Sequence, residues 1–302
     1  MKKNRTMIIT FLTPALICYV MVFLYPSIRT TIMSFFAVEG VTDAISTWKF
    51  AGFDNYIKLF NTPIFIQSMT NIMKIWIVGG LGVLAVALFF AVALTNGMKG
   101  VKFIRSVIYL PNVVSAIAMG TMWISFVYIS DYGFLHNVFK TLGLEQLSQT
   151  LWTGPDRLFW SMLVAYSFGM VGYHMLIFMA SIEQIPKDYK EAAQIEGANV
   201  FQRFFHITIP FLRGCFRTNI VMWTVFTVAF FVWAQLFSPV NLSNATVAPM
   251  NYMYEIVFGS SSSAATVRDS GAGAAVGVIM MVIVIIAFGL TNLIVKNDDV
   301  EL

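Results

Sequence analysis

A polar segment between two long apolar runs carries the most distinctive pattern in this sequence of 302 residues. Residues 181–210 contain Pro186, which suits the first turn of a helix, because the first N–H groups of a helix lack partners anyway. Ala192 and Ala193 follow and give this helix a small face. Gly197 then permits a sharp turn, since glycine adopts a left-handed backbone without a steric penalty. The pattern predicts a helix that ends in a tight turn.

A second short helix is predicted over residues 199–205 of the same segment. Phe201, Phe204 and Phe205 would be its apolar anchors. Pro210 is expected to end it before the next apolar run, because proline removes a backbone donor. The segment as a whole therefore predicts a helix-turn-helix projection.

Such a projection points to docking rather than to a reaction. The small side chains of Ala192 and Ala193 permit close approach to a groove on another protein, and Glu191 can meet a basic group there. The alternative is an amphipathic segment that lies on a membrane surface.

Signatures of hydrolysis, nucleotide binding and metal binding are missing from the sequence. It has no G-x-x-x-x-G-K-[ST], H-E-x-x-H or G-x-S-x-G pattern. The three histidines are scattered, and Cys18 and Cys215 lack the spacing of metal ligands. We therefore expect no cofactor, no metal and no catalytic residue in this chain, and we expect any energy to come from a partner.

The composition places the chain in a membrane. Hydrophobic residues make up 58% of it and charged residues 11%, compared with about 45–50% and about 25% in an ordinary soluble domain. A soluble domain needs a largely polar surface, so the apolar surplus must face lipid. Charged residues are nearly absent from the middle of the apolar runs, which argues against ion-coupled transport.

Six apolar runs are long enough to cross a hydrocarbon layer of about 30 Å, which requires roughly 20 residues. They cover residues 7–36, 75–94, 107–129, 158–180, 219–237 and 272–295. The first is overlong and contains Pro26, so we expect it to span as residues 7–24, uncleaved, and to continue as an interfacial helix or turn. The predicted fold is all-α: a polytopic membrane protein with six transmembrane helices in one domain, residues 1–302.

The distribution of charge sets the expected orientation. Most of the 19 Lys and Arg residues lie on the side of the membrane that holds both termini and residues 181–210. By the positive-inside rule, this side is the cytoplasm. Residues 37–74, 130–157 and 238–271 are then external loops.

The spacing of the polar segment resembles a known family. Glu191-Ala192-Ala193, three residues, Gly197, nine residues and Ile207-Thr208-Ile209-Pro210 resemble the EAA loop of binding-protein-dependent ABC importer permeases, E-A-A-x3-G-x9-I-x-L-P. Ile209 in place of Leu is the one departure. Looser motifs resemble the carbohydrate-uptake branch, specifically the first permease subunit of the maltose and glycerol-phosphate type: Thr13-Pro14-Ala15, Tyr25-Pro26, Phe50-Ala51-Gly52-Phe53-Asp54-Asn55-Tyr56, Tyr109-Leu110-Pro111 and residues 131–137.

The resemblance implies a type I importer permease fold and a set of partners. A second, homologous permease would form a heterodimer with this chain in the bacterial cytoplasmic membrane. Two copies of a cytoplasmic ABC ATPase would bind ATP and Mg²⁺, and a solute-binding protein would deliver the carbohydrate. No nucleic-acid partner is implied, and the chain itself is not an enzyme. The residues implied to couple it to the ATPase are Pro186, Glu191, Ala192, Ala193 and Gly197.

Candidate substrate contacts lie in the fourth and fifth apolar runs. Sugars present apolar faces and a belt of hydroxyl groups, so their sites pair aromatic rings with hydrogen-bonding groups. The candidates are Tyr166, Tyr173 and His174 in the fourth run, and Asn219, Trp223, Thr227 and Phe230 in the fifth, where the spacing of three and four places them on one helix face. The alternative is that they pack the helices together. A neutral carbohydrate ranks above a phosphorylated one, because the runs offer no clear basic residue for a phosphate.

Two other functions remain open from the sequence. A self-contained channel or facilitator for a small polar solute would need no ATPase, but it would leave the EAA-like loop without a purpose. A membrane scaffold would show no dependence on any ligand.

Overall fold

The computed structural model describes residues 2–95, 97–239, 243–259 and 268–294, which are largely helical. Contacts divide the chain into two compact units. The first unit consists of Met1–Ile66 and Tyr252–Val282, and the second of Gln67–Asn251 and Ile283–Leu302. The prediction of one domain over residues 1–302 stays a prediction.

The first unit holds the N-terminal helices and a short antiparallel β-hairpin, in which Phe36 pairs with Phe50 and Ala37 with Lys49. Its elements are α1 (Lys2–Tyr19), α2 (Tyr25–Met33), β1 (Phe36–Ala37), a 3₁₀ turn (Ile45–Thr47), β2 (Lys49–Phe50) and α3 (Asp54–Phe60). Three helices have residues in both units: α4 (Pro63–Lys74), α16 (Pro249–Phe258) and α17 (Ser270–Ile294).

The chain continues as a helix through Pro26, which is one of the two continuations that the sequence predicts for the first span. Residues Ile9–Met33 form one helical segment of 25 residues that is apolar and long enough to cross a membrane. A π-helical turn at Val20–Leu24 precedes Pro26, which then lies in the first turn of α2. Proline is tolerated there because its missing N–H and fixed backbone angle fit the start of a helix.

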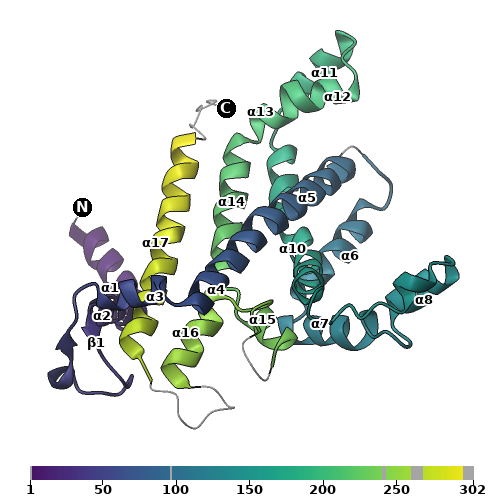
Figure 1. The fold of residues 1–302 in the computed structure, drawn as a ribbon. Coiled ribbons are helices and arrows are strands. Elements are labelled where there is room, and N and C mark those ends of the chain that lie inside the picture. Colours follow the sequence, from purple (N-terminus) through teal and green to yellow (C-terminus); the bar gives the residue numbers. More distant parts are fainter. Residues whose placement is uncertain (1, 96, 240–242, 260–267, 295–302) are drawn as a thin grey trace. The chain divides into compact units, whose positions relative to one another are not determined.

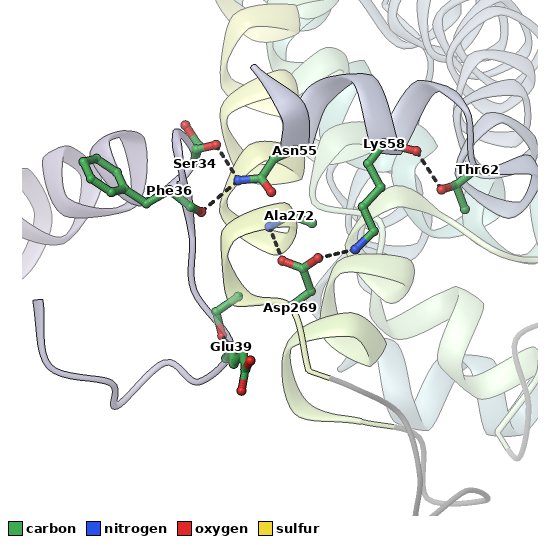
Figure 2. A network of polar contacts seen from close by, with 9 residues as sticks. Ser34, Phe36, Glu39, Asn55, Lys58, Thr62, Asp269 and Ala272 are labelled. Carbon is green, nitrogen blue, oxygen red and sulfur yellow. Dashed lines mark hydrogen bonds and ion pairs between the residues drawn. The ribbon is translucent and has the colours of Figure 1, made fainter. Parts of the chain in front are cut away.

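Polar contacts join distant segments within the first unit (Figure 2). The side-chain amide of Asn55 donates hydrogen bonds to the carbonyl oxygens of Ser34 and Phe36, at 2.8 and 2.9 Å. Asp269 caps the first turn of α17 and forms an ion pair with Lys58. These contacts hold the start of α17 against α3 and the hairpin.

The second unit contains the remaining helices and three π-helical turns. Its helices are α5 (Gly80–Thr95), α6 (Val101–Val113), α7 (Ala116–Met122), α8 (Phe134–Thr141), α9 (Glu145–Ser148), α10 (Leu158–Glu183), α11 (Lys187–Ile195), α12 (Val200–Arg203), α13 (Ile209–Phe211), α14 (Arg213–Val228) and α15 (Val232–Phe237). The π-helical turns are Ile75–Gly79, Trp123–Val127 and Phe204–Thr208.

Helix α10 is the centre of the second unit and packs against α5 and α6. Ala87 and Ala91 of α5 are fully buried in one cluster with Met175 and Phe178 of α10. Gly172 allows α6 to approach closely, because a Cβ there would lie 2.5 Å from the carbonyl oxygen of Ile108. Small residues on α5 and α10 thus let the helix backbones approach each other, as membrane helices require.

The spans agree in part with the prediction of six. Among the described residues, four helical segments are long and apolar enough to cross a membrane: Ile9–Met33, Pro63–Thr95, Leu158–Glu183 and Ser270–Ile294. A fifth is the pair Val101–Val113 and Ala116–Val127, which is bent by 99°. The predicted span over residues 219–237 divides into α14 and α15, separated by residues 229–231.

Candidate functional site

The first candidate site is the helix α11 with the turn that follows it. Pro186 is the N-cap of α11, one residue before the first helical turn in which the sequence predicts it. Gly197 has a φ of +79° and ends the helix. The N–H of Gly197 donates to the carbonyl oxygen of Gln194 at 3.0 Å, and the N–H of Ala198 donates to the carbonyl oxygen of Ala193 at 2.9 Å. This pair of bonds is the Schellman motif, which requires a left-handed residue at the Gly197 position.

A capping box begins the second helix of the projection. The side-chain oxygen of Asn199 accepts from the N–H of Gln202, and the side chain of Gln202 accepts from the N–H of Asn199, both at 2.8 Å. The predicted stop at Pro210 is wrong: helical structure continues from α12 through Phe204–Thr208 into α13, where Pro210 lies in the first turn. The π-helical turn again precedes a proline.

The projection is exposed and partly apolar. In Figure 1, α11 and α12 lie beyond the end of α10 that is far from α15. Glu191, Ala192 and Gly197 are exposed, and Ala193 is half-buried. Two large apolar side chains, Ile195 at 87% and Phe201 at 75% of full exposure, lie on the same segment. Exposed apolar side chains of this size are typical of a surface that another protein or a membrane covers.

The second candidate site is a chain of aromatic rings between α10 and α14, joined by Phe230 from the residues that follow α14. The ring of Tyr166 lies 4.8 Å from that of Phe230 and 5.5 Å from that of Trp223. Trp223 in turn lies 5.9 Å from His174, which contacts Tyr173 at 5.2 Å. The predicted substrate residues of the two helices are therefore neighbours within the second unit.

Polar groups run along this chain of rings. The ring nitrogen Nδ1 of His174 and the Oδ1 of Asn219 lie 2.7 Å apart in a buried hydrogen bond. The hydroxyl groups of Tyr166 and Thr227 lie beside each other. Among the described residues, neither hydroxyl makes a hydrogen bond of good geometry, and the Nε2 of His174 has no partner. Buried polar atoms without partners are rare in proteins and call for a ligand, a water or a rearrangement. All seven predicted residues except Tyr173 are buried in this structure.

Two features of this cluster could not be read from the sequence pattern. The indole N–H of Trp223 donates to the carbonyl oxygen of Trp76 at 2.9 Å, and the indole N–H of Trp76 donates to Thr224 at 2.9 Å. Gly80 leaves room for this contact, because a Cβ there would lie 2.6 Å from the indole nitrogen of Trp223. Helical spacing places Trp223 on a face of α14, but it does not reveal which helix that face meets.

Comparison with known proteins identifies the family. The fold and the site define a class: a helical permease with an exposed projection after its central helix. Residues 83–297 match the family described as "binding-protein-dependent transport system inner membrane component". The chain belongs to this family. It is a multi-pass inner-membrane permease subunit of an ABC importer.

Individual relatives and a solved structure agree with this family. The diacetylchitobiose uptake system permease protein NgcF of Streptomyces coelicolor is 28% identical, over 82% of this chain and 71% of its own length. The arabinooligosaccharides transport system permease protein AraP of Halalkalibacterium halodurans is 29% identical, over 91% and 83%. A chain of a bacterial ABC transporter involved in import of the acidic polysaccharide alginate shares the fold, with a TM-score of 0.79 and 19% identity, over 97% of this chain and 98% of that one.

Proposed function

We propose that this chain is one of two transmembrane subunits of an ATP-driven importer for a neutral carbohydrate. The observation that carries the proposal is the exposed projection of α11 and α12, whose turn at Gly197 has the geometry of a preformed docking element. The names of the two relatives, which concern diacetylchitobiose and arabinooligosaccharides, support a carbohydrate cargo.

In this proposal the projection couples the chain to an ATPase. Ala192 and Ala193 allow the helix to enter a groove, and Glu191 pairs with a basic group inside it. Pro186 and Gly197 fix where the helix begins and ends. Two ATPase subunits hold ATP and Mg²⁺, and their closure moves the projections and switches the cavity between its inward-facing and outward-facing states.

The remaining partners and the orientation belong to the same proposal. A second, homologous permease completes the pathway, and a solute-binding protein delivers the sugar to the external loops. The chain crosses the membrane six times with both termini in the cytoplasm. The helices of residues 101–127 and 213–237 then form the third and fifth crossings as broken spans, which are tolerated where protein surrounds them.

The chain of rings between α10 and α14 is the proposed sugar site. Tyr166, Trp223 and Phe230 offer aromatic faces, while Thr227 and His174 hold buried polar atoms that have no partner in the described part of the chain. Sugar hydroxyl groups would supply the missing hydrogen bonds when the helices separate. Asn219 positions His174, and Tyr173 extends the ring surface on the half-buried side.

Transport in proteoliposomes tests this proposal. The purified complex is reconstituted, and uptake of a labelled neutral oligosaccharide is measured with and without ATP on the cytoplasmic side and with and without the binding protein outside. The proposal predicts uptake only when both are present. Uptake by this chain alone, without ATP, would contradict it.

A further inference from the structure

A cavity of about 490 Å³ lies between α14 and the last turns of α17, within the second unit. Its lining includes no residue of the projection and none of the seven proposed sugar residues. Its lining residues are Arg217, Thr218, Val221, Met222, Phe288 and Asn292.

The lining of this cavity is ordered in two layers. Arg217 and Thr218 of α14 and Asn292 of α17 supply a cation, a hydroxyl and an amide. One helical turn away on each helix, the lining becomes apolar, with Val221 and Met222 on α14 and Phe288 on α17. In the proposed topology, α14 runs outward and α17 inward, so the polar layer faces the cytoplasmic surface and the apolar layer faces the bilayer interior.

The guanidinium of Arg217 is held in place at this cavity by a neighbouring side chain. The Nη1 of Arg217 donates to the side-chain oxygen of Asn292 at 3.2 Å, which fixes the guanidinium at the cavity. In the part of the chain that the structure describes, no carboxylate lies within ion-pair distance of Arg217. Since a half-buried guanidinium has further donors to satisfy, the site favours an anion with several acceptor oxygens.

We propose that this cavity binds the phosphate group of an anionic phospholipid of the cytoplasmic leaflet, with an acyl chain against Phe288, Val221 and Met222. The inference rests on the orientation in the proposed function. A polar layer above an apolar layer at the membrane surface matches a lipid headgroup above its chains, and basic pockets between helices on this side are suited to such headgroups. A free phosphate would use the polar layer only and would leave the apolar layer without a role.

Native mass spectrometry of the purified full-length complex tests the proposal. Phosphatidylglycerol and phosphatidylcholine with identical acyl chains are titrated against the wild type, Arg217→Gln, Arg217→Lys and Arg105→Gln. Arg105 is an exposed residue of α6 on the same proposed membrane side, so its replacement removes one charge away from the cavity. Inorganic phosphate is added as a competitor in a separate arm.

The wild type is expected to prefer phosphatidylglycerol, and Arg217→Gln to reduce this preference about fivefold, the contribution of one basic residue at an anionic surface. Arg217→Lys and Arg105→Gln keep the preference, and inorganic phosphate does not displace the lipid. If Arg217→Gln does not fold, Asn292→Ala, which releases the guanidinium, should lower the preference in the same direction.

Three results would overturn the lipid assignment. They are an unchanged preference in Arg217→Gln, displacement of the lipid by inorganic phosphate, and loss of the second permease from the Arg217→Gln complex, which would make the cavity a subunit interface. The same spectra show how much ATPase remains bound to each variant. Bound ATPase reports on the transport proposal and lipid preference on this assignment, so the two can fail separately.

Discussion

At the scale of single residues, Gly197 shows how one backbone angle shapes the projection. Its φ of +79° is a conformation that side chains with a Cβ disfavour, by about 1–2 kcal/mol. Apart from the two adjacent residues, no described residue has an atom within 4 Å of the position that a Cβ would take. The requirement for glycine is therefore conformational within this chain, and any steric requirement must come from a partner.

The variants Gly197→Ala and Gly197→Trp separate these two requirements. Alanine is expected to loosen the turn and to weaken ATPase binding by about tenfold, whereas tryptophan should abolish coupled transport while leaving membrane insertion intact. Gly214→Ala is the matched control, because Gly214 is helical and also has open space around it. ATPase binding and sugar uptake are measured on reconstituted complexes. Normal uptake by Gly197→Trp would contradict the coupling role.

Two threonines on one face of α14 test the proposed sugar site. Thr227 has a buried hydroxyl without a good hydrogen bond, whereas the hydroxyl of Thr224 accepts from Trp76. Thr227→Val should raise the sugar concentration for half-maximal uptake about fivefold with little change in thermal stability, because a net hydrogen bond contributes about 1 kcal/mol. Thr224→Val should lower the thermal midpoint instead. If both variants change only the thermal midpoint, the cluster packs the helices and does not bind sugar.

At the scale of helices, the sequence predicted the uniform elements well and the interrupted ones poorly. Helix α10 begins at Leu158 as predicted and extends three residues past the predicted end at residue 180, because its apolar run has no interruption. Pro26 was predicted to follow the end of the first span and Pro210 to end a helix, but a π-helical turn precedes each of them and the chain remains helical. Local composition cannot show such turns, since tertiary packing decides whether a helix accommodates a proline.

The sequence also did not predict which element the buried face of each helix packs against. The spacing in α14 placed Asn219, Trp223 and Thr227 on one face, and all three are buried. It did not show that Trp223 meets Gly80 and the carbonyl of Trp76, because the position of that carbonyl depends on the π-helical turn Ile75–Gly79.

The close approach of α6 to α10 predicts a strong effect at Gly172 and a weak one at Gly169. A Cβ at Gly172 would meet the backbone of Ile108 and Tyr109, whereas one at Gly169 would meet nothing within 4 Å. Gly172→Ala should therefore destabilise the chain by about 1–3 kcal/mol through overpacking. Gly169→Ala, one turn away, should be neutral or slightly stabilising. Thermal unfolding in detergent measures both, and equal midpoints for the two variants would refute this account of the helix contact.

At the scale of the whole molecule, the described helices supply fewer candidate spans than the sequence predicts. The described residues contain four helical segments that could cross a membrane, or five with the bent pair, compared with the six predicted. The difference arises at α14 and α15, where the apolar run is helical on both sides of residues 229–231 but broken between them. Whether such a broken segment spans depends on the protein around it, which a single sequence does not specify.

Labelling of single cysteines tests the proposed orientation. In a background without Cys18 and Cys215, Asn4→Cys should react with a membrane-impermeant maleimide only after the cells are permeabilised. Ile45→Cys, whose parent side chain is exposed in the predicted external segment, should react in intact cells. These results follow from the excess of Lys and Arg on the side of the termini. Reaction of Asn4→Cys in intact cells would reverse the orientation.

Purification of the tagged chain from its native membrane, with identification of every stoichiometric partner, tests the central claim most directly. The account predicts a second permease, an ABC ATPase in two copies and an ATPase activity that sugar-loaded binding protein stimulates. Glu191→Arg and Gly197→Trp should release the ATPase and keep the second permease, because both residues belong to the projection. A chain that purifies alone, or an ATPase that stays bound in both variants, would contradict the claim that α11 couples this permease to ATP hydrolysis.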